Sequence, residues 1–195
     1  MGRGEYAGGM GEIRVNRAPF LTLWASVVAR RLGYGEDEAL TLGRTVAGLM
    51  AQSKGRRLGI YTPSPEGKRQ ALREKREEIG TETVEMMGRS VPCVRTADGL
   101  RALSAASPTD PESVRRYLRE RFKDALAPVE EKLVELAETF EPAELDRAAM
   151  NVYLRLRPNV PKGREGWGKA GLLDTDAIDA LIVSRRRSGA GPRRP

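Results

Sequence analysis

The sequence predicts a mostly α-helical protein, with one multi-helix domain and one small β-hairpin at about residues 82–95. Two observations support this fold class. Apolar residues recur every three or four positions along most of the chain, which is the pattern of helices that bury one face. Capping residues and prolines stand before several of these runs, as they do at helix starts. The 195 residues, 39% apolar and 31% charged, fit a single domain with a real core.

The two ends of the chain depart from this helical pattern. Residues 1–12 are rich in glycine, so we expect a disordered leader there. Residues 185–195 contain five arginines and no acid, so we expect a disordered basic tail. The helical domain is therefore predicted to span residues 13–184.

The first two predicted helices, at residues 18–32 and 36–53, form an αα-hairpin around a short glycine turn. Asn16 is expected to cap the first helix. Apolar side chains cover more than half of the circumference of that helix, which predicts a central position. The second helix has a stripe of small residues that lets another backbone approach closely. Its members are Ala39, Gly43, Ala47 and Ala51.

The middle of the chain combines charged and β-favouring segments. We expect a basic turn at residues 54–57, a short extended piece after it, and an exposed charged helix that ends near Ile79. Two β-favouring runs around Gly88 predict the β-hairpin. Within it, Pro92 must face a sheet edge, and Cys93 is expected to be buried as a small apolar side chain.

Prolines and loops divide the second half of the chain into further predicted helices. A short helix is expected at residues 100–105. Asp110 followed by a proline is a strong helix start, and Pro128 is expected to divide the run that follows into two helices. Another helix is expected at residues 142–155. After a glycine-rich loop, Asp174 is expected to cap a last helix through residue 183.

Composition excludes several classes of chemistry. The chain has no histidine, so Ser-His-Asp and Cys-His mechanisms are excluded. Its single cysteine cannot form an internal disulfide or a cysteine zinc cluster. We expect no cofactor and no metal, and the sequence favours a protein that is not an enzyme, with a carboxylate-only or lysine-based site left open. No run reaches the roughly 18 apolar residues of a membrane span, so we expect no membrane partner and a cytoplasmic location.

Two motif matches fail on their context. Residues 163–169 fit the phosphate-loop spacing G-x-x-x-x-G-K, but Ala170 replaces the magnesium-binding hydroxyl residue and no strand is predicted before the loop. The hairpin at residues 18–53 has the spacing of a DNA-reading helix-turn-helix. Its second helix, however, begins with Glu36 and Asp37, which phosphates would repel. We therefore expect the hairpin to be part of the core.

Two basic clusters are candidates for contacts with nucleic-acid backbones, which would bind phosphates without reading sequence. One cluster lies at residues 54–76, where Lys75 and Arg76 add to the local positive charge, and the other lies in the tail. The alternative for both is a solvated helix face and a solubilising tail. The candidate binding residues are Lys54, Arg56, Arg57, Lys68, Arg69, Arg73, Arg185, Arg186 and Arg187.

Two functions follow from these patterns. The first is a non-enzymatic accessory protein that binds DNA or RNA without sequence preference, through the phosphates. The net charge of +7 supports this function only in part, because five of those charges belong to residues 185–195. The alternative is a protein–protein interaction module, such as a homodimer formed through amphipathic helices or the hairpin edge. An acid-rich stretch at residues 130–146 predicts an acidic side, which would either repel nucleic acid from one face or pair with a basic patch on a second copy.

Several segments of the chain together resemble an uncharacterised family of small bacterial helical proteins. These segments are residues 16–25 (Asn-Arg-Ala-Pro-Phe-Leu-Thr-Leu-Trp-Ala), 37–43, 53–55, 88–92 and 157–168. The resemblance covers most of residues 13–183. It implies a small cytoplasmic helical protein, and it implies no activity, ligand or site.

Overall fold

A computed structural model describes residues 13–60, 62, 64–160 and 169–189. These residues form a mostly helical fold, as predicted, with two small antiparallel sheets. The helices are α1 (Arg17–Arg31), α2 (Glu36–Arg57), α3 (Glu66–Glu78), α4 (Pro111–Phe122), the 3-10 turn η1 (Lys123–Ala125), α5 (Leu126–Glu138), α6 (Pro142–Leu156) and α7 (Thr175–Gly189). The strands are β1 (Ile13–Asn16), β2 (Glu82–Met86), β3 (Arg89–Thr96), β4 (Gly99–Ser104), β5 (Ser107–Pro108) and β6 (Ala170–Leu173).

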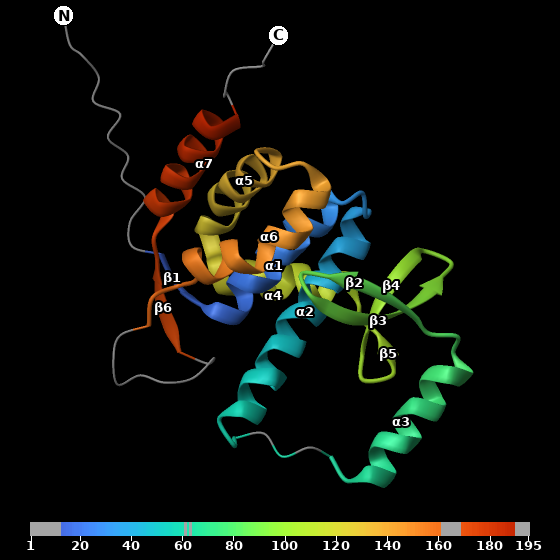
Figure 1. The fold of residues 1–195 in the computed structure, drawn as a ribbon. Helices are drawn as coiled ribbons and strands as arrows, with labels where there is room; N and C mark the ends of the chain where they lie inside the picture. Colours follow the sequence, from blue (N-terminus) through green and yellow to red (C-terminus); the bar gives the residue numbers. More distant parts are fainter. Residues whose placement is uncertain (1–12, 61, 63, 161–168, 190–195) are drawn as a thin grey trace, which may run out of the picture.

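The central helix is α1, as its wide apolar surface predicts. All residues from 19 to 29 are buried. Figure 1 shows α2, α4, α5 and α6 arranged around α1, and each of them contacts it. Trp24 is fully buried, and its Nε1 donates a 2.8 Å hydrogen bond to the Ala149 carbonyl oxygen of α6. This helix therefore forms the middle of the core.

The stripe of small residues on α2 packs against α1 over half of its length. A Cβ atom added at Gly43 would lie 2.3 Å from Ser26 Oγ and 2.6 Å from the Thr22 carbonyl oxygen, so no larger residue fits there. Ala47 is buried, one turn further along. Beyond it, a Cβ at Gly48 would meet nothing within 4 Å. The small residues of α2 therefore pack against a helix at one end and border open space at the other.

The predicted β-hairpin is confirmed as β2 and β3. Met86 pairs with Arg89, so Met87 and Gly88 form a two-residue loop, and both have positive φ, as a type I′ turn requires. The ladder between β3 and β4 begins at Cys93. Pro92 therefore lies where β3 pairs only with β2, at the edge that its missing N–H requires.

The predicted short helix at residues 100–105 is wrong. Residues 100–104 belong to β4, which pairs with β3 on one side and β5 on the other, so the hairpin extends to a four-stranded sheet. Gly99, at φ +103°, closes the second hairpin of this sheet. Leu100 and Ala102 are buried there, and tertiary packing of this kind outweighs the helical preference of leucine and alanine.

The ends of the folded part also differ from expectation. Residues 13–16 pair with residues 170–173 as β1 and β6, a pairing between distant segments that local patterns do not predict. The tail predicted to be disordered from residue 185 begins inside α7, which continues to Gly189. The leader at residues 1–12 and residues 190–195 lie outside the described residues.

The predicted helix caps are confirmed at two sites. The Asp110 carboxylate accepts hydrogen bonds from the backbone N–H groups of Glu112 and Ser113 at the start of α4. The Asp174 carboxylate accepts one from Ala177 N–H at the start of α7. The predicted break near Pro128 is also present, as η1 lies just before α5 and places this proline in the first turn of α5.

One part of the molecule stands apart from the core, and we call it the arm. It comprises the described residues from 54 to 80, none of which is buried. The basic turn predicted at residues 54–57 is instead the last turn of α2, which ends at Arg57. The exposed charged helix is confirmed as α3, and Figure 1 shows it away from α1, α5, α6 and α7. Arg76 Nε links the arm to the turn after β4 through a 2.8 Å hydrogen bond to the Ala105 carbonyl oxygen.

Candidate nucleic-acid interface

The arm and the end of the sheet enclose a cavity of about 470 Å³, which we call the basic cavity. Three elements contribute its walls: the end of α2, one face of α3 and the turn after β4. Five of the residues that line it are basic, and none of the described lining residues is acidic. The lining consists of Gln52, Arg56, Ser64, Lys68, Arg69, Leu72, Arg73, Arg76, Ser104 and Ala105.

Helical spacing brings the basic side chains of α3 to the cavity. Arg69, Arg73 and Arg76 are three and four residues apart, so they lie on one face of the helix. The acids of α3 are close by but do not line the cavity: Glu66 pairs with Arg69, and Glu74 Oε1 accepts a 2.8 Å hydrogen bond from Gln70 Nε2. The side chains of α3 that reach the cavity are therefore basic, apart from Leu72.

The ion pair between Arg69 and Glu66 in the arm is exposed and weak. Arg69 forms an ion pair with Glu66 one turn earlier, and 48% and 64% of these two side chains is exposed. An exposed pair of this kind contributes at most about 1 kcal/mol. A phosphate that enters the cavity can therefore compete for the Arg69 guanidinium at small cost.

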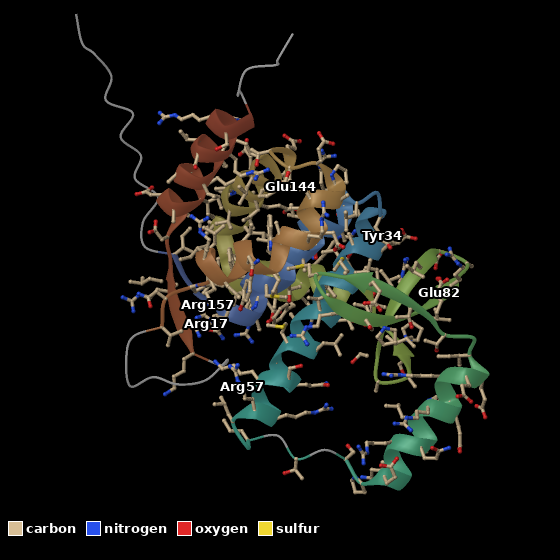
Figure 2. The ribbon with its side chains drawn as sticks, in the orientation of Figure 1. Arg17, Tyr34, Arg57, Glu82, Glu144 and Arg157 are labelled. Carbon is tan, nitrogen blue, oxygen red and sulfur yellow. The ribbon has the colours of Figure 1, made fainter. Side chains whose placement is uncertain are left out.

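The structure brings together four of the six candidates that the sequence places around residues 54–76. Arg56, Lys68, Arg69 and Arg73 line the basic cavity. Lys54 and Arg57 lie on the same last turn of α2 but outside the lining, and Figure 2 shows Arg57 at the end of that helix.

Arg76 completes the lining but was not among the candidate binding residues. Sequence reasoning counted it only as local charge. Its spacing of three residues from Arg73 is the signal that could have found it.

The candidates in the tail have a different role. Arg185 forms two hydrogen bonds with the Glu144 carboxylate, at 2.8 and 2.9 Å, and its guanidinium lies 3.7 Å from the centre of the Phe140 ring. Arg186 pairs with Glu135 at 2.9 Å. Figure 2 shows Glu144 on α6, on the other side of the molecule from Arg57.

For residues 185–189, α7 and these contacts correct the prediction of a disordered basic tail. Arg185 holds α7 against α6, whereas Arg186 forms an exposed pair with Glu135 of α5 and Arg187 is exposed on the same helix. An acid of the stretch at residues 130–146 also has a partner within the same chain, since Glu130 forms an ion pair with Arg30 at 2.5 Å. Two of the three tail candidates therefore have acidic partners within the protein, and Arg185 is the one that is partly buried.

A second cavity of about 570 Å³ adjoins the basic cavity, and we call it the neutral cavity. It lies between α2, α4 and the turn after β4, and its lining is mostly small or uncharged. No sequence pattern indicated it. The residues that line it are Ala18, Arg44, Thr45, Ala47, Gly48, Ala51, Gln52, Arg76, Leu103, Ser104, Ala105, Thr109, Asp110, Ser113, Val114 and Tyr117.

The N-terminus of α2 is part of the body, which agrees with our rejection of a DNA-reading helix. Asp37 and Glu36 there bind Arg115 of α4, at 2.5 and 3.2 Å. Arg115 donates these hydrogen bonds, and they raise its pKa above the ordinary value. The bond to Asp37 has the largest effect. The acids at this helix end are therefore engaged with α4 of the same chain.

The described residues offer little for other chemistry. Cys93 is fully buried, and burial raises the pKa of its thiol to about 12, so it is not a nucleophile. Among the residues described, no group of three or more acidic or cysteine side chains could hold a metal ion. None of the described helices is both long and apolar enough to cross a membrane. Residues 163–168 of the G-x-x-x-x-G-K match lie outside the described residues.

Comparisons with known proteins give no relative from which a role could be transferred. No family model, no curated protein and no solved structure matches the chain. The resemblance to a bacterial family therefore stays a prediction. The function of the basic cavity must be argued from its geometry and charge.

Proposed function

We propose that this protein binds nucleic acid through backbone phosphates at the basic cavity, without acting as an enzyme. One observation carries the proposal: five basic side chains from two helices line a single cavity of about 470 Å³, and no described lining residue is acidic. Phosphates are the anionic groups that arginine recognises best, because its planar fork of donors matches their oxygens.

The length of the basic row favours a polymer over a single phosphate. From Lys68 to Arg76, α3 rises about 12 Å at about 1.5 Å per residue. One nucleic-acid strand carries a charge about every 3.4 Å along its axis. The row on α3 therefore spans several consecutive phosphates, which contribute affinity but no sequence preference.

A salt titration tests this function. We expect a fluorescently labelled oligonucleotide to bind at ~50 mM salt, with log affinity that falls linearly against log salt with a slope of about −3 to −5 for five phosphate contacts. Fluorescence anisotropy measures both quantities. No binding of DNA or RNA at ~50 mM salt, or an affinity that salt does not change, would contradict the proposal.

A protein–protein contact is the second candidate, and two exposed apolar side chains favour it. Leu58 is 52% exposed and Ile60 is 78% exposed, both directly after α2. A second copy of the chain that covers these side chains would remove apolar surface from water. Sedimentation equilibrium of the wild type and of Ile60→Ser tests this. We expect the wild type to associate and the variant to stay monomeric, and a monomeric wild type at high concentration removes the candidate.

A further inference from the structure

We infer that the basic and neutral cavities form one groove for single-stranded nucleic acid, with phosphates in the first and an unpaired base in the second. This inference rests on the proposed function and adds to it the form of nucleic acid that is bound.

The two cavities adjoin and share four lining residues. Gln52, Arg76 and Ser104 line both, as does Ala105. Arg76 stands at the junction, where its Nε is held by the Ala105 carbonyl oxygen while the side chain still lines both cavities. A ligand whose phosphate lies in the basic cavity can therefore extend directly into the neutral one.

The neutral cavity carries the groups that a base edge needs. Hydroxyls and an amide line it, and these groups both donate and accept hydrogen bonds, while the Asp110 carboxylate there already caps α4. The Thr109 hydroxyl oxygen is buried there without a hydrogen-bond partner. A buried polar group of this kind costs free energy unless a ligand or a water satisfies it. The polar lining groups are Thr45, Gln52, Ser104, Thr109, Asp110 and Ser113.

The cavity also offers a flat surface and open space. Arg44 lies 4.3 Å and Arg121 lies 5.6 Å from the centre of the Tyr117 ring, so guanidinium groups already contact this ring, and the flat surface that we assign to a base is the guanidinium of Arg44. Unpaired bases stack on arginine guanidinium planes. Gly48 follows Arg44 by one turn on α2 and also lines the cavity, and an added Cβ there would meet nothing within 4 Å. The volume of about 570 Å³ lies within the usual range of ligand pockets, about 300–1,000 Å³.

A duplex cannot use this arrangement. Its base edges are paired with the other strand and its base faces are stacked, so a base must leave the helix before it can enter a cavity. A single strand exposes both the edge and the face without that cost. The neutral cavity therefore adds affinity for single strands only, whereas the basic cavity attracts both forms.

The test compares three probes on three proteins. The probes are a single strand, the matching duplex and an abasic strand of the same length, as DNA and as RNA. The proteins are the wild type, Gly48→Leu and Gly48→Ala. Leucine at position 48 projects into the neutral cavity and meets no neighbour within 4 Å at its Cβ, and both replacements favour the helix over glycine.

We expect the wild type to bind the base-bearing single strand at least about tenfold more tightly than the duplex or the abasic strand, a difference in the range found for one stacked base. Gly48→Leu should remove this preference and leave duplex affinity unchanged, while Gly48→Ala should largely retain it. Equal affinity for all probes, or a Gly48→Leu variant that keeps the single-strand preference, overturns the inference but leaves the proposed function standing. Absence of binding by every probe overturns both.

Discussion

The body and the arm are both built from charged helices, yet they use their residues in opposite ways. In α1 every residue from 19 to 29 is buried. In α3 none is buried, and Arg76 Nε donates a hydrogen bond to the Ala105 carbonyl oxygen in the turn after β4. The body therefore derives its stability from packing, whereas the arm contributes little stability and keeps its charges accessible.

The arginines of the two regions show the same contrast. Arg185 of α7 faces Glu144 and the Phe140 ring, and these partners fix it to the body. Arg73 of α3 faces the basic cavity, together with other basic side chains. In the sequence both lie in basic runs of similar density. The neighbours that the fold supplies decide whether an arginine stabilises the protein or is available to a ligand.

The two regions should differ most in the free energy of unfolding that is lost when a large apolar side chain is replaced by alanine. We expect Trp24→Ala to lower the free energy of unfolding by about 3–5 kcal/mol, because it removes a buried side chain and leaves a cavity. Leu72→Ala in the arm should cost less than about 1 kcal/mol, since Leu72 is only partly buried. Urea unfolding followed by circular dichroism measures both. Similar losses for the two variants would contradict the contrast.

A substitution where α2 meets the sheet should lower the free energy of unfolding by an intermediate amount, and this loss should depend on pH. Glu38 accepts hydrogen bonds from the backbone N–H groups of Leu100, at 2.9 Å, and Gly35, at 3.0 Å. These bonds lower the pKa of Glu38 below its ordinary value of 4.5, and the bond from Leu100 has the largest effect. We expect Glu38→Gln to cost about 1–3 kcal/mol near pH 7.

The sign of this pH dependence follows from the lowered pKa. The stabilising contribution of the carboxylate is present above the ordinary pKa of 4.5 and is lost as pH falls through the lower folded-state value. The difference in unfolding free energy between wild type and Glu38→Gln should therefore shrink as the solution is acidified below about pH 4.5. A difference that stays constant, or grows, on acidification would show that this carboxylate does not act as described.

The smallest expected losses of stability are those on replacing Arg185 of α7 and Arg73 of α3, and they should differ from each other. Arg185→Gln removes the cation–π contact with Phe140, which is worth about 1 kcal/mol, together with the ion pair to Glu144. Arg73→Gln should change stability by no more than about 0.5 kcal/mol, as for most exposed positions. Thermal unfolding of the two variants side by side tests this, and an Arg73→Gln variant that is the less stable of the two would reverse our assignment.

Local signals in the sequence were sufficient to predict most of the helices. Asp110 and Asp174 cap helices because their carboxylates bind N–H groups two or three residues away. The strand at residues 99–104 could not be predicted in this way, since its leucines and alanines favour a helix until the sheet buries them. The pairing of β1 with β6 was also missed, because it joins residues more than 150 positions apart.

In the candidate site, too, local sequence patterns predict some residues, whereas others come together only in the fold. The basic residues of α3 follow from the local excess of positive charge in the sequence, and helical spacing then places several of them on one face. The arginines of α7 were misread, since their acidic partners lie on α5 and α6. The neutral cavity gave no signal, because Arg44, Thr109 and Tyr117 come from separate elements that meet only in the fold.

The most direct test of the central claim compares two triple variants that remove equal charge. Lys68→Gln/Arg69→Gln/Arg73→Gln changes the arm, and Arg185→Gln/Arg186→Gln/Arg187→Gln changes α7. At ~50 mM salt we expect the arm variant to bind an oligonucleotide at least about tenfold more weakly than the wild type, with a salt slope smaller by about 2. The α7 variant, confirmed as folded by circular dichroism, should keep the wild-type affinity within about threefold. Equal losses in both variants, or a greater loss in the α7 variant, would contradict the account, because binding would then depend on net charge or on α7 and not on the basic cavity.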